Sequence, residues 1–95
     1  MLSAAETAAV YAWLNEKRPG MIANLSTIRL IAKRYFGPMD WRSQNGWGDC
    51  AIFVTFTDHN ITGSSNNSLD AMLTALHKLI GNVPEKKYDM RRYEH

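Results

Sequence analysis

The chain has 95 residues, of which 45% are hydrophobic and 21% are charged, so its composition is that of a globular domain and excludes a chain that is disordered throughout. The formal net charge is +2, which is too small to indicate a nucleic-acid partner by itself. The single cysteine, Cys50, excludes an internal disulfide and fits a reducing compartment.

The N-terminal sequence and the hydropathy predict a cytoplasmic protein with no membrane partner. The first six residues have no basic region and include Glu6, which is untypical of a secretory signal. No apolar run reaches the roughly 20 residues that a membrane span requires. We expect one domain over residues 1–81, followed by a partly mobile tail over residues 82–95.

A first helix is predicted from Ser3 to about residue 17 or 18. Ser3 and Glu6 have the spacing of a capping box, and Pro19 and Gly20 end the helix. One arc carries the large apolar residues Val10, Tyr11, Trp13 and Leu14. The opposite arc consists of alanines: Ala4, Ala5, Ala8, Ala9 and Ala12. We expect the alanine arc to pack within the domain; the alternative is a dimer interface, so a monomer and a homodimer both remain open.

A second helix is predicted from a cap at Asn24 or Ser26 to Phe36, because Gly37 and Pro38 follow directly. Its buried stripe is expected to contain Leu25, Ile28, Ile31, Ala32, Tyr35 and Phe36. The opposite arc places one large apolar residue among three cations: Arg29, Leu30, Lys33 and Arg34. This arc is a candidate partner surface; the alternative is a solvated basic face that complements the helix dipole.

The middle of the chain predicts an antiparallel hairpin. Asn45-Gly46 is typical of a two-residue turn, which predicts a short strand over residues 40–44 and a long strand over 47–57. A short third strand is predicted at 61–63. The hairpin contains Trp41, Arg42 and Trp47, residue types that are enriched at interface hot spots. The alternative is that both tryptophans fasten the hairpin to the core.

A third helix is predicted from Asn67 or Ser68 to Gly81. Its apolar stripe contains Leu69, Met72, Leu73, Leu76, Leu79 and Ile80. Because the predicted strands lie between helices, we expect an α+β fold. It consists of two N-terminal helices, a two- to three-stranded antiparallel sheet and one C-terminal helix packed on the sheet.

No residue spacing in the chain is typical of an enzyme, and none is typical of a metal site. Cys50 and His59 would lie about 30 Å apart at opposite ends of the long strand. Cys50 is expected to be a small buried hydrophobic residue. We therefore expect a non-enzymatic protein with no catalytic residue, no metal and no cofactor.

Residues 24–34 read NLSTIRLIAKR, in which a Ser-Thr-Ile start is followed by Arg and Lys. This segment resembles the turn and recognition helix of helix-turn-helix regulators. The resemblance implies a DNA-binding regulator that uses residues 24–36 as its recognition helix, with the hairpin at 40–57 as a wing. The residues facing the major groove would be Ser26, Thr27, Arg29 and Lys33.

The strand at 61–63, the polar loop after it and the helix from Leu69 to Leu76 are similar to the strand-to-helix unit of HicB-type antitoxins. The small α+β format without a catalytic motif also resembles phage-encoded inhibitors such as anti-CRISPR proteins. This format implies a protein that a phage or mobile element encodes for host takeover. Such a protein would inhibit or modulate a host protein or nucleoprotein complex by occupying its surface. We expect its contacts at Arg29, Leu30, Lys33, Arg34, Trp41, Arg42 and Trp47.

Overall fold

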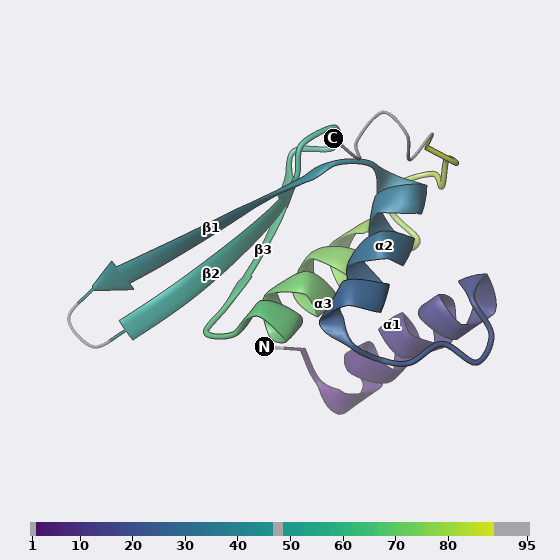
Figure 1. The fold of residues 1–95 in the computed structure, drawn as a ribbon, viewed down its shortest axis with the longest axis horizontal. Helices are drawn as coiled ribbons and strands as arrows, with labels where there is room; N and C mark the ends of the chain where they lie inside the picture. The colour runs from purple at the N-terminus through teal and green to yellow at the C-terminus, as the bar shows by residue number, and fades with distance from the viewer. Residues whose placement is uncertain (1, 47–48, 89–95) are drawn as a thin grey trace.

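The computed structural model describes residues 2–46 and 49–88 (Figure 1). The elements are α1 (Ala4–Lys17), α2 (Leu25–Phe36), β1 (Met39–Gly46), β2 (Asp49–Phe56), β3 (Ile61–Ser65) and α3 (Ser68–Leu79). The strands form one antiparallel sheet in the order β1-β2-β3. The predicted α+β fold is confirmed. None of the helices in the described residues is both long and apolar enough to cross a membrane.

The hydrophobic core lies where the helices meet one face of the sheet. α3 packs on β2 and β3, and α1 and α2 pack on α3 (Figure 1). Each fully buried large side chain stabilises the fold by about 1.5–3 kcal/mol relative to an exposed one. These side chains come from all three helices and from β2: Val10, Leu14, Ile28, Phe36, Val54, Phe56, Met72, Leu76 and Leu79.

β3 approaches α3 closely because Gly63 has no side chain. A Cβ atom at Gly63 would lie 2.6 Å from the carbonyl oxygen of Ala71 and would also collide with the backbone of Ala75. Ala71 and Ala75 are one turn apart on α3, and both are buried. Three small residues therefore set the distance between the helix and the sheet.

The alanine arc of α1 is exposed. The buried residues of α1 are Val10, Trp13 and Leu14, whereas the other arc faces solvent: Ala4, Ala5, Ala8, Ala9 and Ala12. The prediction that this arc packs within the domain is therefore wrong. The physical reason is that α1 lies in the outer layer of the domain, so α2 and α3 cover only one side of it.

The hairpin of β1 and β2 is longer than predicted, and its turn is displaced. The strands pair from Met39–Phe56 to Gly46–Asp49, so Asn45-Gly46 belongs to β1 and does not form the turn. Residues 47 and 48 lie outside the described residues. The observed register pairs Met39 with buried Phe56 and Trp41 with buried Val54. Core burial therefore outweighs the local turn preference of Asn-Gly.

The outer part of this hairpin extends beyond the third strand. β3 pairs with β2 only between Phe56–Ile61 and Ile52–Ser65, and the end of the hairpin projects from the domain (Figure 1). Cys50 lies in this projecting part and is exposed. The prediction of a buried cysteine is therefore wrong, because no helix covers that end of β2.

Residues 82–88, named the C-terminal strap, lie against the last turn of α2. The backbone N–H of Lys86 donates to the carbonyl oxygen of Tyr35 (3.2 Å), and that of Tyr88 donates to the carbonyl oxygen of Arg34 (2.8 Å). Carbonyl groups in the last turn of a helix have no intrahelical donor, so the strap supplies two. The rest of the predicted mobile tail, residues 89–95, lies outside the described residues.

Candidate partner-binding site

The outward face of α2 carries the cations that the sequence marks as contact candidates. Arg29 and Arg34 are exposed, and Lys33 is half-buried. Leu30 lies among them with 49% of its surface exposed. Within residues 2–46 and 49–88, the large hydrophobic side chains that are exposed are Leu30 and Ile22. An apolar side chain bordered by cations has the arrangement of an interface core with a polar rim.

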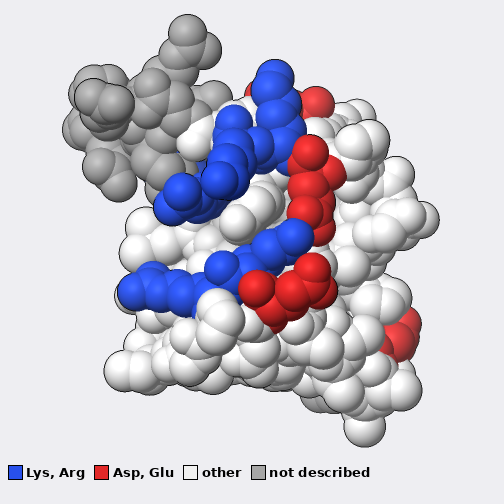
Figure 2. Space-filling view, turned by 90° about the vertical axis from the view of Figure 1, so that its right-hand side faces the viewer, with Lys and Arg blue, Asp and Glu red and all other residues white. Residues whose placement is uncertain are grey.

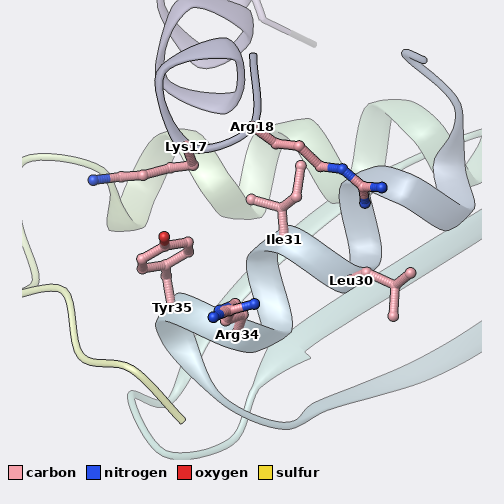
Figure 3. A pocket seen from close by; sticks show the side chains of 6 residues that line it. All are labelled: Lys17, Arg18, Leu30, Ile31, Arg34 and Tyr35. Carbon is pink, nitrogen blue, oxygen red and sulfur yellow. The ribbon is translucent and has the colours of Figure 1, made fainter. Parts of the chain in front are cut away.

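A groove of about 550 Å³ runs between the C-terminal end of α1 and α2 (Figure 3). It is named the α1–α2 groove, and it is lined by Lys17, Arg18, Leu30, Ile31, Arg34 and Tyr35. Figure 3 shows Arg18 extending from α1 above Ile31 toward Leu30, while Arg34 and Tyr35 project from α2. Ile31 is 5% exposed, so it forms a nearly buried apolar floor.

The charges on this side of the molecule are arranged in rows. Figure 2 shows two bands of basic side chains, separated by a strip of uncharged surface and bordered at one end by acidic side chains. Among the described residues, no carboxylate lies within ion-pair distance of Arg18 or Arg34. The groove is thus lined by two arginines that have no carboxylate partner in residues 2–46 and 49–88.

Lys17, in contrast, is already paired with a carboxylate of the C-terminal strap. Its Nζ lies 2.6 Å from Oε2 of Glu85, and the indole N–H of Trp13 donates to Oε1 of Glu85 at 2.6 Å. The bonds from Lys17 and Trp13 lower the pKa of Glu85, and the bond to Glu85 raises the pKa of Lys17. The Lys17 ammonium also lies 5.1 Å from the ring centroid of Tyr35. At this end of the groove, the ammonium group of Lys17 is thus already paired with a carboxylate of the same chain.

A second hollow, of about 300 Å³, lies on the other side of Leu30. It is lined by Ser26, Arg29, Leu30, Lys33 and Met39. The guanidinium carbon of Arg29 lies 4.9 Å from the ring centroid of Trp41, a cation–π geometry. Trp41 is half-buried, and its indole nitrogen has no acceptor among the described residues. Trp41 thus positions Arg29 at the edge of this hollow.

The structure brings most of the predicted contact residues together and separates one of them. Arg29, Leu30, Lys33 and Arg34 share the outward face of α2, and Trp41 packs under Arg29. Arg42 follows Trp41 in β1 and therefore faces the opposite side of the sheet.

On that opposite side, Arg42 Nε lies 3.2 Å from Oδ2 of Asp40, and Arg42 lines a hollow with Phe53 and Thr55. Arg42 is thus not part of the face formed by α2. Trp47, the other predicted contact from the hairpin, lies outside the described residues.

The residues proposed for DNA contact do not all lie on the same accessible surface. Ser26, Arg29 and Lys33 lie around the smaller hollow. Thr27 is half-buried, and its backbone N–H donates to the capping side chain of Asn24 at 2.9 Å. Three of the four residues therefore share one accessible side of α2.

Arg18 and the strap residue Glu85 were missed by sequence reasoning. Arg18 follows the last residue of α1, and it reaches α2 only because residues 19–24 turn the chain back. Glu85 reaches Lys17 across 68 positions of sequence. Helical periodicity describes one helix at a time, so it contains no signal for either contact.

The described residues contain no group of three or more potential metal ligands from His, Cys, Asp and Glu. His59 Nε2 lies 3.0 Å from the carbonyl oxygen of Phe36, and His77 Nε2 lies 3.6 Å from Oε2 of Glu6. Each of these histidines thus has a partner within the domain.

Comparisons with family models, with curated proteins and with solved structures gave no match for this chain. We therefore infer its function from the residues and the geometry described above.

Proposed function

We propose that the protein is a small non-enzymatic binding protein that modulates a partner protein or nucleoprotein complex by occupying part of its surface. The contact surface is the outward face of α2 together with the α1–α2 groove. The observation that carries this proposal is the half-exposed Leu30, which borders both hollows and stands between the cations of α2 and Arg18. The phage origin and the inhibitory action remain predictions from the resemblance in size and format.

The apolar content of this surface favours a protein partner over nucleic acid. Phosphate groups are bound by cations and other hydrogen-bond donors, and they leave exposed aliphatic groups such as those of Leu30 without a complementary surface. A protein surface provides both apolar side chains and carboxylates. Central apolar contacts with a charged rim are the usual anatomy of protein interfaces.

Affinity capture from a lysate of the cells that produce the protein tests this proposal. The wild-type chain is compared with an Arg18→Glu/Arg34→Glu variant, with nuclease added to half of each sample. Arg42→Glu is the matched control, because Arg42 is an exposed arginine on the opposite side of the sheet. We expect the wild type and the control to retain a protein partner in the presence of nuclease, and the double variant to lose it. Retention of the same partner by the double variant would contradict the proposal.

DNA binding is the second candidate, because Ser26, Arg29 and Lys33 lie together on one accessible side of α2. Fluorescence anisotropy with a mixed-sequence duplex checks it. Phosphate neutralisation predicts that log K falls linearly with log salt, with a slope of about −0.9 per phosphate contacted. This candidate is excluded if no duplex binding is detected at low salt.

A further inference from the structure

We propose that the ligand of the α1–α2 groove is a short acidic protein segment that carries one large aliphatic side chain. The aliphatic side chain packs on Leu30, Ile31 and Tyr35, and its neighbouring carboxylates bind Arg18 and Arg34. This inference rests on the proposed function and names the class of ligand for the same surface.

The size and the floor of the groove fit such a side chain. Its volume of about 550 Å³ falls within the range of about 300–1,000 Å³ that is typical of ligand sites. The floor is nearly closed, since Ile31 is 5% exposed, while Leu30 at the rim is 49% exposed. Tyr35 is held against the apolar body of the domain by an edge-on contact with Trp13, with ring centroids 5.8 Å apart. The apolar surface is thus largely formed before a ligand binds.

The arrangement of the two arginines defines the charge of the ligand. Figure 3 shows Arg18 just after the end of α1 and Arg34 on α2, with Ile31 between them. No described carboxylate pairs with either arginine. A guanidinium group binds a carboxylate through two parallel hydrogen bonds, and such charge-assisted bonds are about twice as strong as neutral ones. Two acidic residues flanking one aliphatic residue would satisfy both arginines.

The chain itself provides an internal example of this recognition. The C-terminal strap runs over the last turn of α2, and the carboxylate of its Glu85 binds Lys17 and Trp13. Lys17 lines the same groove. Because Glu85 pairs with Lys17, Arg18 and Arg34 are the groove cations without a carboxylate partner among the described residues, and they can bind a ligand that lies beside the strap.

Fluorescence anisotropy with a labelled ten-residue peptide tests the inference. The peptide has a central leucine with two glutamates on each side and neutral ends. We expect saturable binding that weakens about tenfold for Arg18→Gln and for Arg34→Gln, since each variant removes a charge-assisted pair. Leu30→Ser should weaken binding several-fold, and Arg42→Gln should leave it unchanged. Thermal unfolding followed by circular dichroism verifies that each variant is folded.

Two further peptides separate the parts of the inference. Replacing the leucine by serine, or the glutamates by glutamines, should each abolish measurable binding. Equal affinity for the glutamine peptide would overturn the role of the arginines, and tighter binding of an oligothymidylate would overturn the choice of a protein ligand. If no acidic peptide binds while lysate capture still depends on Arg18 and Arg34, the ligand class is wrong and the partner-binding surface stands.

Discussion

Gly63 is the residue on which the contact between β3 and α3 depends most directly. An added Cβ would collide with the backbone of Ala71 and Ala75 in α3, and backbone cannot move aside as the end of a flexible side chain can. We expect Gly63→Ala to lower the free energy of unfolding by about 2–3 kcal/mol, the upper range for overpacking a core. Chemical denaturation followed by circular dichroism measures this change.

Gly46→Ala is the matched control, because a Cβ at Gly46 would meet no atom within 4 Å. Its free energy of unfolding should stay within about 0.5 kcal/mol of the wild type. Equal destabilisation by the two substitutions would contradict the close approach of β3 to α3.

At the level of elements, the C-terminal strap is held by groups that titrate. Hydrogen bonds from Lys17 and Trp13 lower the pKa of Glu85 in the folded protein. The stability that Glu85 gives to the docked strap is therefore present above the unfolded pKa of a glutamate, and it is lost as the pH falls through the folded pKa. The bond to Glu85 raises the pKa of Lys17 in the folded protein. The stability that Lys17 gives to the docked strap is therefore fully present below the unfolded pKa of a lysine, and it is lost as the pH rises through the folded pKa. The strap should therefore be most firmly docked between about pH 5 and pH 10.

The acidic limit of this window can be measured by amide hydrogen exchange. Protection of the Lys86 and Tyr88 amides, which bond to α2, should fall by up to about fivefold between pH 6 and pH 3. The effect is modest because the Glu85 side chain is 38% exposed, and solvent screening limits its ion pair to about 1 kcal/mol or less.

In the Glu85→Gln variant, the Lys86 and Tyr88 amides should show the low protection at both pH 6 and pH 3, since a glutamine side chain cannot ionise. Glu16→Gln is the control, because Glu16 lies 4.0 Å from Lys17 and is 74% exposed. Protection in the wild type that does not change with pH would argue against docking by Glu85.

Helices are the elements that the sequence predicts best. The caps of α1, α2 and α3 and the apolar stripes of α2 and α3 depend on short-range spacing, which a single sequence displays directly. The predicted turn at Asn45-Gly46 gave the wrong hairpin register, because the register depends on which residues of β1 pair with Val54 and Phe56 over the core. The exposure of Cys50 follows from that register and from the length of β3, so it was missed for the same reason.

At the scale of the whole molecule, only part of the candidate site could be predicted from the sequence. Helical spacing placed Arg29, Leu30, Lys33 and Arg34 on one face, which the structure shows. Arg18 joins them through the packing of α1 beside α2, a long-range contact without a local pattern. Strand alternation, in contrast, already places adjacent residues of a strand on opposite faces, so the separation of Arg42 from Trp41 was predictable.

The central claim is that Leu30 contacts a partner protein. The most direct measurement is photo-crosslinking in the producing cells, with a benzophenone amino acid at position 30 or, as the control, at Gln44 on the far side of the sheet. We expect a crosslinked protein product from position 30 that resists nuclease and disappears when Arg34→Glu is added. Crosslinks from Gln44 with none from position 30, or a product that nuclease removes, would contradict it.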